Sequence, residues 1–364
     1  MSLDIYVWSC KAICNGGHLS GISSPRPIIV KSEIRWMEEV EMEQRYRTFD
    51  YLRGLSILAV VLIHLTVPTA IAEETGGIIL NQITRFGVPV FIFLSGWGLT
   101  VAESYERSAS YFVFLKKRLS KLLPAYLVWN IIYVLYDVIF EDLDFTISAF
   151  IEGIFYGTNY PHLYFVPLIV LFYLAFPILR KMGETHWGLF VSFMITIGSL
   201  EFYPILKEGF TQNQNPFNWL FYFVFGIWIA EHDEMVKKQL NNYLLFIGFI
   251  FSLLYMVMEP IAIADDLVLA QTRPSVLFYS VFVILMTVNL PKWLNYSKDL
   301  LKPLGDYSFA IYLSHYLFIR IYRLIWPDIP VIILLVLVIS SSIVLEKVKQ
   351  KLIKSNPLGN IRKL

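Results

Sequence analysis

The chain has 364 residues, of which 56% are hydrophobic and only 16% are charged, and its mean hydropathy is +0.58. Soluble globular proteins carry about 25% charged residues, so this chain has too little charge to cover a surface that faces water. The composition predicts an integral membrane protein, and the net charge of +1 argues against nucleic acid as a partner.

Residues 1–44 have mixed polarity and contain both cysteines, Cys10 and Cys14, with His18 close by. Two thiols and one imidazole without a second cluster make a poor metal site, so no bound metal is expected. We interpret the segment as a poorly structured cytosolic leader, or as upstream sequence that precedes a later start codon.

Apolar stretches long enough to span a membrane follow one another from Leu52 onward. Between the third and the fourth of them, residues 145–157 form a shorter apolar segment, which is expected to lie at the membrane interface or to re-enter the membrane. The ten expected spans are residues 52–72, 79–101, 119–140, 161–180, 186–205, 216–231, 242–259, 273–290, 305–326 and 329–346.

The loops between these spans alternate in charge. Loops that follow even-numbered spans contain clustered lysine and arginine, as in "KKRLSK", whereas loops that follow odd-numbered spans, such as "EETGG" and "EDLD", contain almost none. The basic tail, residues 347–364, continues this pattern. Because cation-rich loops stay in the cytosol, the sequence predicts an all-α integral membrane protein, a bundle of about ten transmembrane helices with both termini cytosolic.

The first expected span carries two groups that lipid accommodates poorly, Arg53 at its start and His64 near its middle. Eleven residues of helix extend about 16 Å over about three turns, so both side chains lie on one face. Arg53 alone is explained by the preference of cations for the cytosolic interface, and His64 alone by a hydrogen bond to another helix. Together they suit an elongated ligand with an anionic head, and intramembrane ionisable groups are candidates for function.

Three cations, Lys117, Arg118 and Lys121, cluster at the cytosolic end of the third span, and Arg118 and Lys121 share one helical face. The cluster fits anionic lipid head groups. It also fits a phosphate-bearing ligand, because arginine can bind phosphate through two parallel hydrogen bonds. The residues alone leave both interpretations open.

Further polar residues lie in the expected spans or at their outer ends. A run of small residues, "SGWG", indicates close helix packing or the passage of a ligand, and Arg85 is expected at the outer interface. The residues expected to line a polar substrate cavity that opens outward are Ser95, His162, Tyr164, Glu201 and His315.

Several of these segments, in this order, resemble the acyltransferase family 3 membrane proteins. The family's opening helix, Leu-Arg-Gly followed by a histidine, is matched by "YLRGLSILAVVLIH", and its second-span element by "FIFLSGW". The elements "RLSKLLPAY", "HLYFVPL" and "YSFAIYLSH" are similar to later family motifs, with Lys121 in place of the usual second arginine and Tyr164 in place of tryptophan. The resemblance covers residues 45–346.

The resemblance implies transfer of an acyl group, usually acetyl, from cytosolic acyl-CoA to a hydroxyl of a cell-surface polysaccharide or its lipid-linked precursor, in the bacterial plasma membrane. His64 would act as general base or as nucleophile. Membrane lipids and polysaccharide biosynthesis proteins are further expected partners. No extracytoplasmic domain is expected after the last span, so direct transfer is favoured. The residues that would bind the coenzyme A phosphates are Arg53, Lys117, Arg118 and Lys121.

Two alternatives fit the same composition. A polytopic transporter would also be an apolar bundle with buried histidine and arginine, although the sequence has no visible internal repeat or paired broken helices of the transporter kind. A non-catalytic membrane subunit of polysaccharide synthesis or export would not need His64. Turnover of acyl-CoA that depends on His64 separates the enzyme from both.

Overall fold

The chain divides into two units, residues 1–46 and 47–364. All residues that the computed structural model describes belong to the second unit. The expected leader and the end of the basic tail lie outside the described residues. The described part of the chain consists of helices and turns, without strands. It comprises residues 48–68, 75–101, 111–141, 144–202, 212–263, 270–289 and 295–355.

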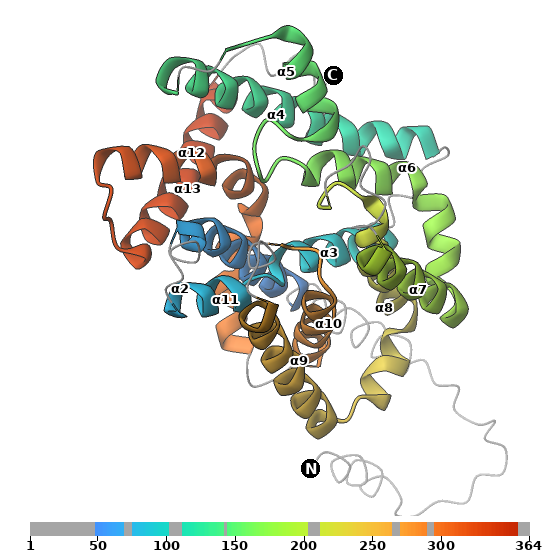
Figure 1. Ribbon diagram of the computed structural model, residues 1–364. Helices are drawn as coiled ribbons and strands as arrows, with labels where there is room; N and C mark the ends of the chain where they lie inside the picture. The colour runs from blue at the N-terminus through green and yellow to red at the C-terminus, as the bar shows by residue number, and fades with distance from the viewer. Residues whose placement is uncertain are drawn as a thin grey trace, which may run out of the picture. The chain divides into compact units, whose positions relative to one another are not determined.

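The first described helix is Thr48–Pro68, which we call the first helix. Figure 1 labels most of the helices that follow it. In chain order the remaining elements are α2 (Thr75–Ile83), α3 (Gly87–Val101), α4 (Tyr111–Phe140), α5 (Ile147–Tyr156), α6 (Phe165–Gly183), α7 (His186–Phe202), η2 (Pro216–Asn218), α8 (Leu220–Gln239), α9 (Asn242–Ile263), α10 (Pro274–Val288), α11 (Asn295–Asp306), α12 (Ser308–Ile325) and α13 (Val331–Ser355).

Each of the ten expected spans corresponds to a described helix, which confirms the prediction of an all-α membrane bundle. Six helical segments are long and apolar enough to cross a membrane, and α7, α8 and α10 contribute shorter apolar helices. The second expected span contains a turn at 84–86, between α2 and α3. The helix α11 was not expected, because its sequence "NYSKDLLKPLGD" is largely polar.

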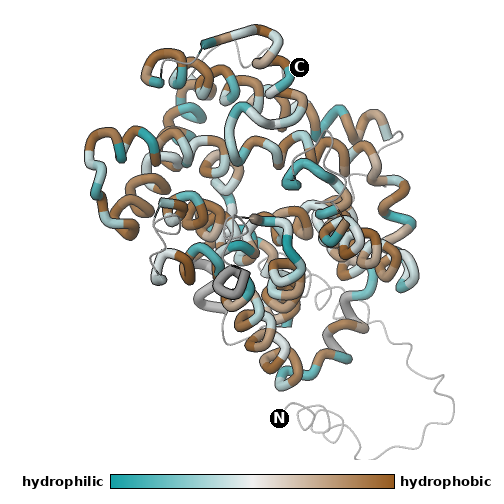
Figure 2. The backbone as a smooth tube through the Cα atoms, in the orientation of Figure 1, coloured by the Kyte–Doolittle hydropathy of each residue, from teal (hydrophilic) through white to brown (hydrophobic). Residues whose placement is uncertain are grey.

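Large apolar side chains cover much of the surface of the bundle. Figure 2 shows hydrophobic residues along most of the helices and hydrophilic residues mainly near helix ends and connections. Exposed examples on α9 and α13 include Phe251, Leu254, Ile332 and Val336. A water-soluble protein seldom exposes apolar patches of this extent, so these faces suit contact with lipid.

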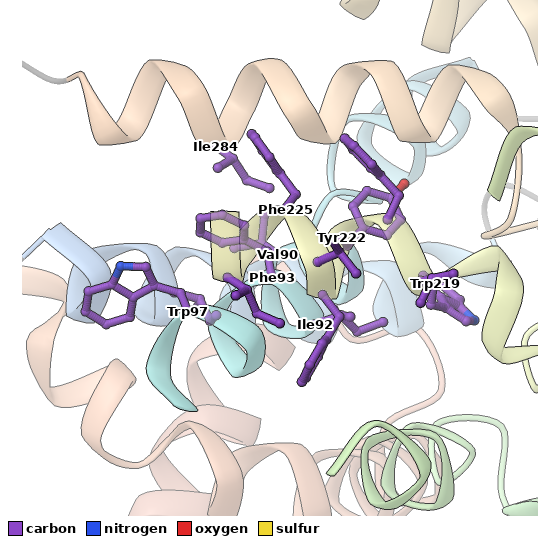
Figure 3. Close-up of a cluster of buried hydrophobic side chains, with 14 of the residues drawn as sticks. Val90, Ile92, Phe93, Trp97, Trp219, Tyr222, Phe225 and Ile284 are labelled. Carbon is purple, nitrogen blue, oxygen red and sulfur yellow. The ribbon is translucent and has the colours of Figure 1, made fainter. Parts of the chain in front are cut away.

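The core is centred on the crossing of α3 and α8, which Figure 3 shows with Ile284 of α10 packed beside them. Glycines permit this crossing: a Cβ atom on Gly96 would lie 2.1 Å from the carbonyl oxygen of Phe223, and one on Gly226 would lie 2.1 Å from that of Phe93. The backbones of the two helices are therefore in direct contact. The small-residue run of the second span serves helix packing at Gly96.

A second close approach fixes the start of the first helix. A Cβ atom on Gly54 would lie 2.4 Å from the carbonyl oxygen of Leu301 in α11, and one on Gly305 would lie 2.7 Å from that of Asp50. The helix α11 thus packs against the backbone on both sides of Arg53. This contact gives a structural reason for the glycine in the "LRG" motif.

The ends of α5 are fixed by a cap at each side, and the second cap leads into the turn before α6. Thr146 caps the first turn of α5, and its hydroxyl accepts a hydrogen bond from the backbone N–H of Ala149 (3.4 Å). Gly157 ends the helix with φ of 69°, a left-handed conformation that favours glycine. A Cβ atom there would also lie 2.4 Å from the Cα of Tyr164. Gly157 therefore positions the segment that carries His162.

Candidate functional site

A cavity of about 650 Å³ lies among the first helix, α3, α4, α6 and α12. This volume falls in the range of pockets that hold small ligands, about 300–1,000 Å³. The first helix lines it with residues that lie on one face, as the helical period requires. These residues are Arg53, Val60, Ile63, His64 and Val67.

One end of the cavity is cationic. Arg53, Arg118 and Lys121 line it, and the loop charges predict that this end faces the cytosol. Arg118 and Lys121 are three residues apart on α4 and so share a face, whereas Lys117 is exposed and does not line the cavity. Arg53 forms an ion pair with Asp50, with 2.9 Å between Nη1 and Oδ1. Two helices thus direct three cations toward one end of the cavity.

Ser95 of α3 and Tyr173 of α6 line the cavity near these cations. The Ser95 hydroxyl donates a hydrogen bond to the carbonyl oxygen of Phe91 (2.9 Å) and also contacts the Tyr173 hydroxyl. Tyr173 interacts electrostatically with Arg118 and Arg53. Sequence reasoning missed Tyr173, because an aromatic residue inside an apolar span carries no signal of function.

Three histidines from distant parts of the chain meet beside the cavity, and we call them the histidine cluster. Between ring centroids, His64 lies 5.2 Å from His315 and 6.2 Å from His162, and His162 lies 4.8 Å from His315. His64 is half-buried and lines the cavity together with His162, whereas His315 is fully buried and does not line it. Among the described residues, no group of three potential ligands has the geometry of a metal site.

Aromatic residues enclose the His162 ring. Ring centroids of Tyr133, Tyr312 and Tyr316 lie 5.3 Å, 5.4 Å and 5.6 Å from it. Neither ring nitrogen has a hydrogen-bond partner of good geometry among the described residues. The nearby carbonyl group of Leu313 accepts a hydrogen bond from Tyr133 (2.7 Å). The His162 ring is therefore buried at the edge of the cavity, with the carbonyl group of Leu313 beside it.

The remaining part of the cavity is lined by Arg85, Tyr164, Asn213 and Gln271. Arg85 was expected at the outer interface, and its side chain is buried within the bundle, with only 1% of its surface exposed. Its guanidinium donates to the Asn81 side chain (2.5 Å) and to Gln271 (3.4 Å), and Gln271 donates back to the Arg85 carbonyl. An arginine inside an apolar span was a signal that could have been used.

The structure does not bring every expected residue to the cavity. Glu201 is exposed near the end of α7 and does not line it. Glu201 instead interacts electrostatically with Tyr255 of α9. Asn213 and Gln271 come from connecting segments, where polar residues are ordinary, so their place at the cavity follows from the fold alone.

An ionic network supports the histidine cluster from the side of α4. Arg320 of α12 pairs with Asp137 (2.6 Å) and Glu141 and donates to the Tyr160 hydroxyl. Tyr160 stacks on Tyr133 with 4.0 Å between ring centroids. Burial and a hydrogen bond to Asp137 raise the pKa of Tyr160 above its ordinary value. Tyr160 therefore stays a neutral donor at physiological pH.

Replacing Arg320 with methionine should lower the free energy of unfolding by about 1.5–3 kcal/mol, the cost of losing hydrogen bonds between charged groups. Thermal melts of the detergent-purified variant would measure the loss. Lys349→Met is the control, because Lys349 is 56% exposed in its pair with Glu346 and such pairs contribute about 0–1 kcal/mol. Equal melting temperatures for the two variants would contradict a structural role for the network.

Comparison with known proteins gives one family and several relatives. The sequence matches the acyltransferase domain family Acyl_transf_3 over residues 46–346. A Bacillus subtilis (strain 168) protein described as a membrane-bound acyltransferase, YfiQ, is 26% identical over 308 residues, 77% of this chain and 84% of that protein. A Staphylococcus aureus (strain MSSA476) protein described as a poly-beta-1,6-N-acetyl-D-glucosamine export protein is 23% identical over 286 residues, 73% of this chain and 80% of that protein. No solved structure matches the chain.

Proposed function

Because this chain belongs to the acyltransferase domain family and is a multi-pass membrane acyltransferase, we propose that it transfers an acyl group from acyl-CoA to a glycan hydroxyl. Acyl-CoA enters from the cytosol and the glycan meets it at the other end of the cavity, in a bacterial plasma membrane. The observation that carries the proposal is one cavity lined by Arg53, Arg118 and Lys121 at one end, by His64, and by Arg85 with amide side chains elsewhere.

The cationic end fits the phosphate groups of coenzyme A. Arg53, Arg118 and Lys121 offer charged donors there, and phosphate groups form strong hydrogen bonds with such donors. His64 lies eleven residues beyond Arg53 on the same helical face, about 16 Å along the axis. An extended thioester arm with its phosphates at the cations would run along this face toward His64. Acetyl is the acyl group we favour.

His64 is proposed as the catalytic imidazole. As a general base it takes the proton of the acceptor hydroxyl while that oxygen attacks the thioester carbonyl, and the coenzyme leaves as a thiol. As a nucleophile it first forms an acyl-imidazole and releases the thiol, and the acceptor hydroxyl then takes the acyl group. Mass spectrometry of protein denatured rapidly at neutral pH separates the two routes, because only the second adds an acyl group to the peptide that contains His64.

The part of the cavity lined by Arg85, Asn213 and Gln271 fits an acceptor rich in hydroxyl groups. Amide and guanidinium side chains donate to sugar hydroxyls, and amide oxygens accept from them. The Staphylococcus aureus relative is named for a polymer of N-acetylglucosamine. That name supports a cell-surface glycan, or its lipid-linked precursor, as the acceptor.

The test is release of free thiol from acetyl-CoA by the full-length protein in lipid nanodiscs, with a crude glycan-lipid extract as acceptor. We expect thiol release that depends on protein and on extract, with radiolabelled acetyl recovered in the lipid fraction. The absence of both thiol release and label in the lipid fraction would contradict acyl transfer, whereas label and thiol release that do not depend on His64 would contradict only its catalytic role.

Replacing Arg118 with glutamate should raise the KM for acyl-CoA about 10–100-fold, the loss of one charged hydrogen bond converted to affinity. The matched control is Lys117→Glu, which makes the same charge change one residue away but outside the cavity. Steady-state kinetics of thiol release would measure both. An equal rise in KM in the two variants would indicate a general effect of surface charge instead of phosphate binding.

Transport is a second candidate, because one relative is named as an export protein. A transporter would move a glycan through the same cavity without consuming acyl-CoA. Thiol release and glycan uptake into proteoliposomes separate the two: we expect thiol release with His64 intact and no glycan accumulation. Accumulation without thiol release would support transport.

A further inference from the structure

The bonding of the buried residue His315 fixes the position of its proton. Its Nδ1 atom lies 2.7 Å from the carbonyl oxygen of Tyr312 and 3.1 Å from that of Ile311. Carbonyl oxygens only accept hydrogen bonds, so Nδ1 must carry the proton. In the neutral ring the other nitrogen, Nε2, is then a lone-pair acceptor.

The Nε2 atom of His315 is buried and has no hydrogen-bond partner among the described residues. A buried acceptor that stays unpaired costs free energy, so a donor is expected to reach it. Two imidazole rings are close to it: that of His162, 4.8 Å away between centroids at 66°, and that of His64, 5.2 Å away and tilted by 40°. Catalytic hydrogen bonds in unliganded active sites are often long or poorly aligned and tighten when the substrate binds.

We propose that His315 is a positioning residue that accepts a hydrogen bond from the His64 ring, so that the other His64 nitrogen presents its lone pair to the cavity. His162 is a weaker candidate for this role, because its ring is 6.2 Å from His64 and nearly perpendicular to it at 71°. The effect of His315 on turnover rests on the proposed function. The hydrogen bond between His315 and His64 does not depend on that function.

The consequence for His64 is a single tautomer and a fixed ring orientation. A second group that holds one imidazole nitrogen sets which nitrogen carries the proton and raises the basicity of the other. At metal sites, losing a group that orients an imidazole ligand typically costs about 10–100-fold in affinity or activity, and we expect a loss of similar size here. The proposed acceptor is the Nε2 atom of His315. Two amide substitutions, one that replaces this atom and one that does not, can therefore separate hydrogen bonding to His64 from simple packing.

The experiment compares His315→Gln with His315→Asn. The side-chain amide of glutamine reaches the place of Nε2 and can accept from His64, whereas that of asparagine replaces only Nδ1. We expect the asparagine variant to lose about 10–100-fold in kcat for thiol release with little change in KM, and the glutamine variant to retain most of kcat. Ser314→Ala is the control, because Ser314 is buried on the same helix and donates to Ala310 (2.8 Å).

A second measurement needs no turnover. Diethyl pyrocarbonate transfers an ethoxycarbonyl group to an unprotonated imidazole nitrogen, and peptide mass spectrometry reports the rate at His64. We expect slower labelling of His64 in the asparagine variant than in the wild type, and near wild-type labelling in the glutamine and Ser314→Ala variants. Melting curves and size exclusion select variants that fold alike.

The two measurements distinguish the two proposals. Equal labelling of His64 in the asparagine and glutamine variants would overturn the role of His315, whatever the activity. Slower labelling in the asparagine variant alone would support that role even if the wild-type protein released no thiol, and in that case only the proposed acyl transfer would fail.

Discussion

Replacing His64 with glutamine is expected to reduce thiol release from acyl-CoA by about 10²–10⁴-fold, the range for loss of a positioned acid–base group. The side chain is half-buried and lines the cavity, so the substitution removes the imidazole without opening the core. The KM for acyl-CoA should change little, because the cations that fit the phosphates remain. Initial rates over a range of acyl-CoA concentrations would measure both parameters.

The control for this prediction is His186→Gln. His186 is exposed at the start of α7, contacts Trp228 and His232, and lies outside the cavity. It should retain wild-type kcat. If the His64 variant also kept its turnover while melting like the wild type, His64 could not be the catalytic imidazole, although the protein would still consume acyl-CoA.

Adding one methyl group at Gly96 is expected to destabilise the whole bundle. The new Cβ atom would lie 2.1 Å from the carbonyl oxygen of Phe223, and a backbone atom cannot move aside as a flexible side chain can. Overpacking of this kind costs about 1–3 kcal/mol, and the backbone contact puts Gly96→Ala at the upper end. Gly226→Ala should behave in the same way, because its Cβ atom meets Phe93 across the same crossing.

The matched control is Gly98→Ala, two residues along the same helix, where no neighbouring atom lies within 4 Å of the added Cβ. Alanine has a higher helix propensity than glycine by up to about 1 kcal/mol, so this variant should melt at or above the wild-type temperature. Differential scanning fluorimetry in one detergent would compare all three. A similar fall for Gly98→Ala would show that the helix tolerates no substitution, and the packing argument at Gly96 would lose its support.

Much of the fold could be predicted because apolar length and loop charge are local properties. The stretches around Arg53 and His64 are helical as expected, and their shared face follows from the helical period alone. The same reasoning placed Arg118 and Lys121 on one face of α4, and both line the cavity. The helix α11 was missed because its polar sequence gave no spanning signal.

The arrangement of the candidate site could be predicted only in part. His162 and His315 were expected in a substrate cavity, but their contact with His64 depends on how distant helices pack. Glu201 and Lys117 were expected to contribute, yet neither lines the cavity. Sequence indicates that a residue is polar within an apolar span, whereas the rotation of each helix about its axis decides what that residue faces.

A cavity with unlike ends has a consequence for bioenergetics. If the cationic end receives the donor and the opposite end receives the acceptor, each substrate enters and leaves the cavity from its own side of the membrane. Neither substrate then has to cross the bilayer. Only a small acyl group changes sides, and the exchange of a thioester for a more stable oxygen ester favours that passage. A protein of this design needs no ion gradient and no ATP of its own, because cytosolic metabolism has already energised the group it delivers.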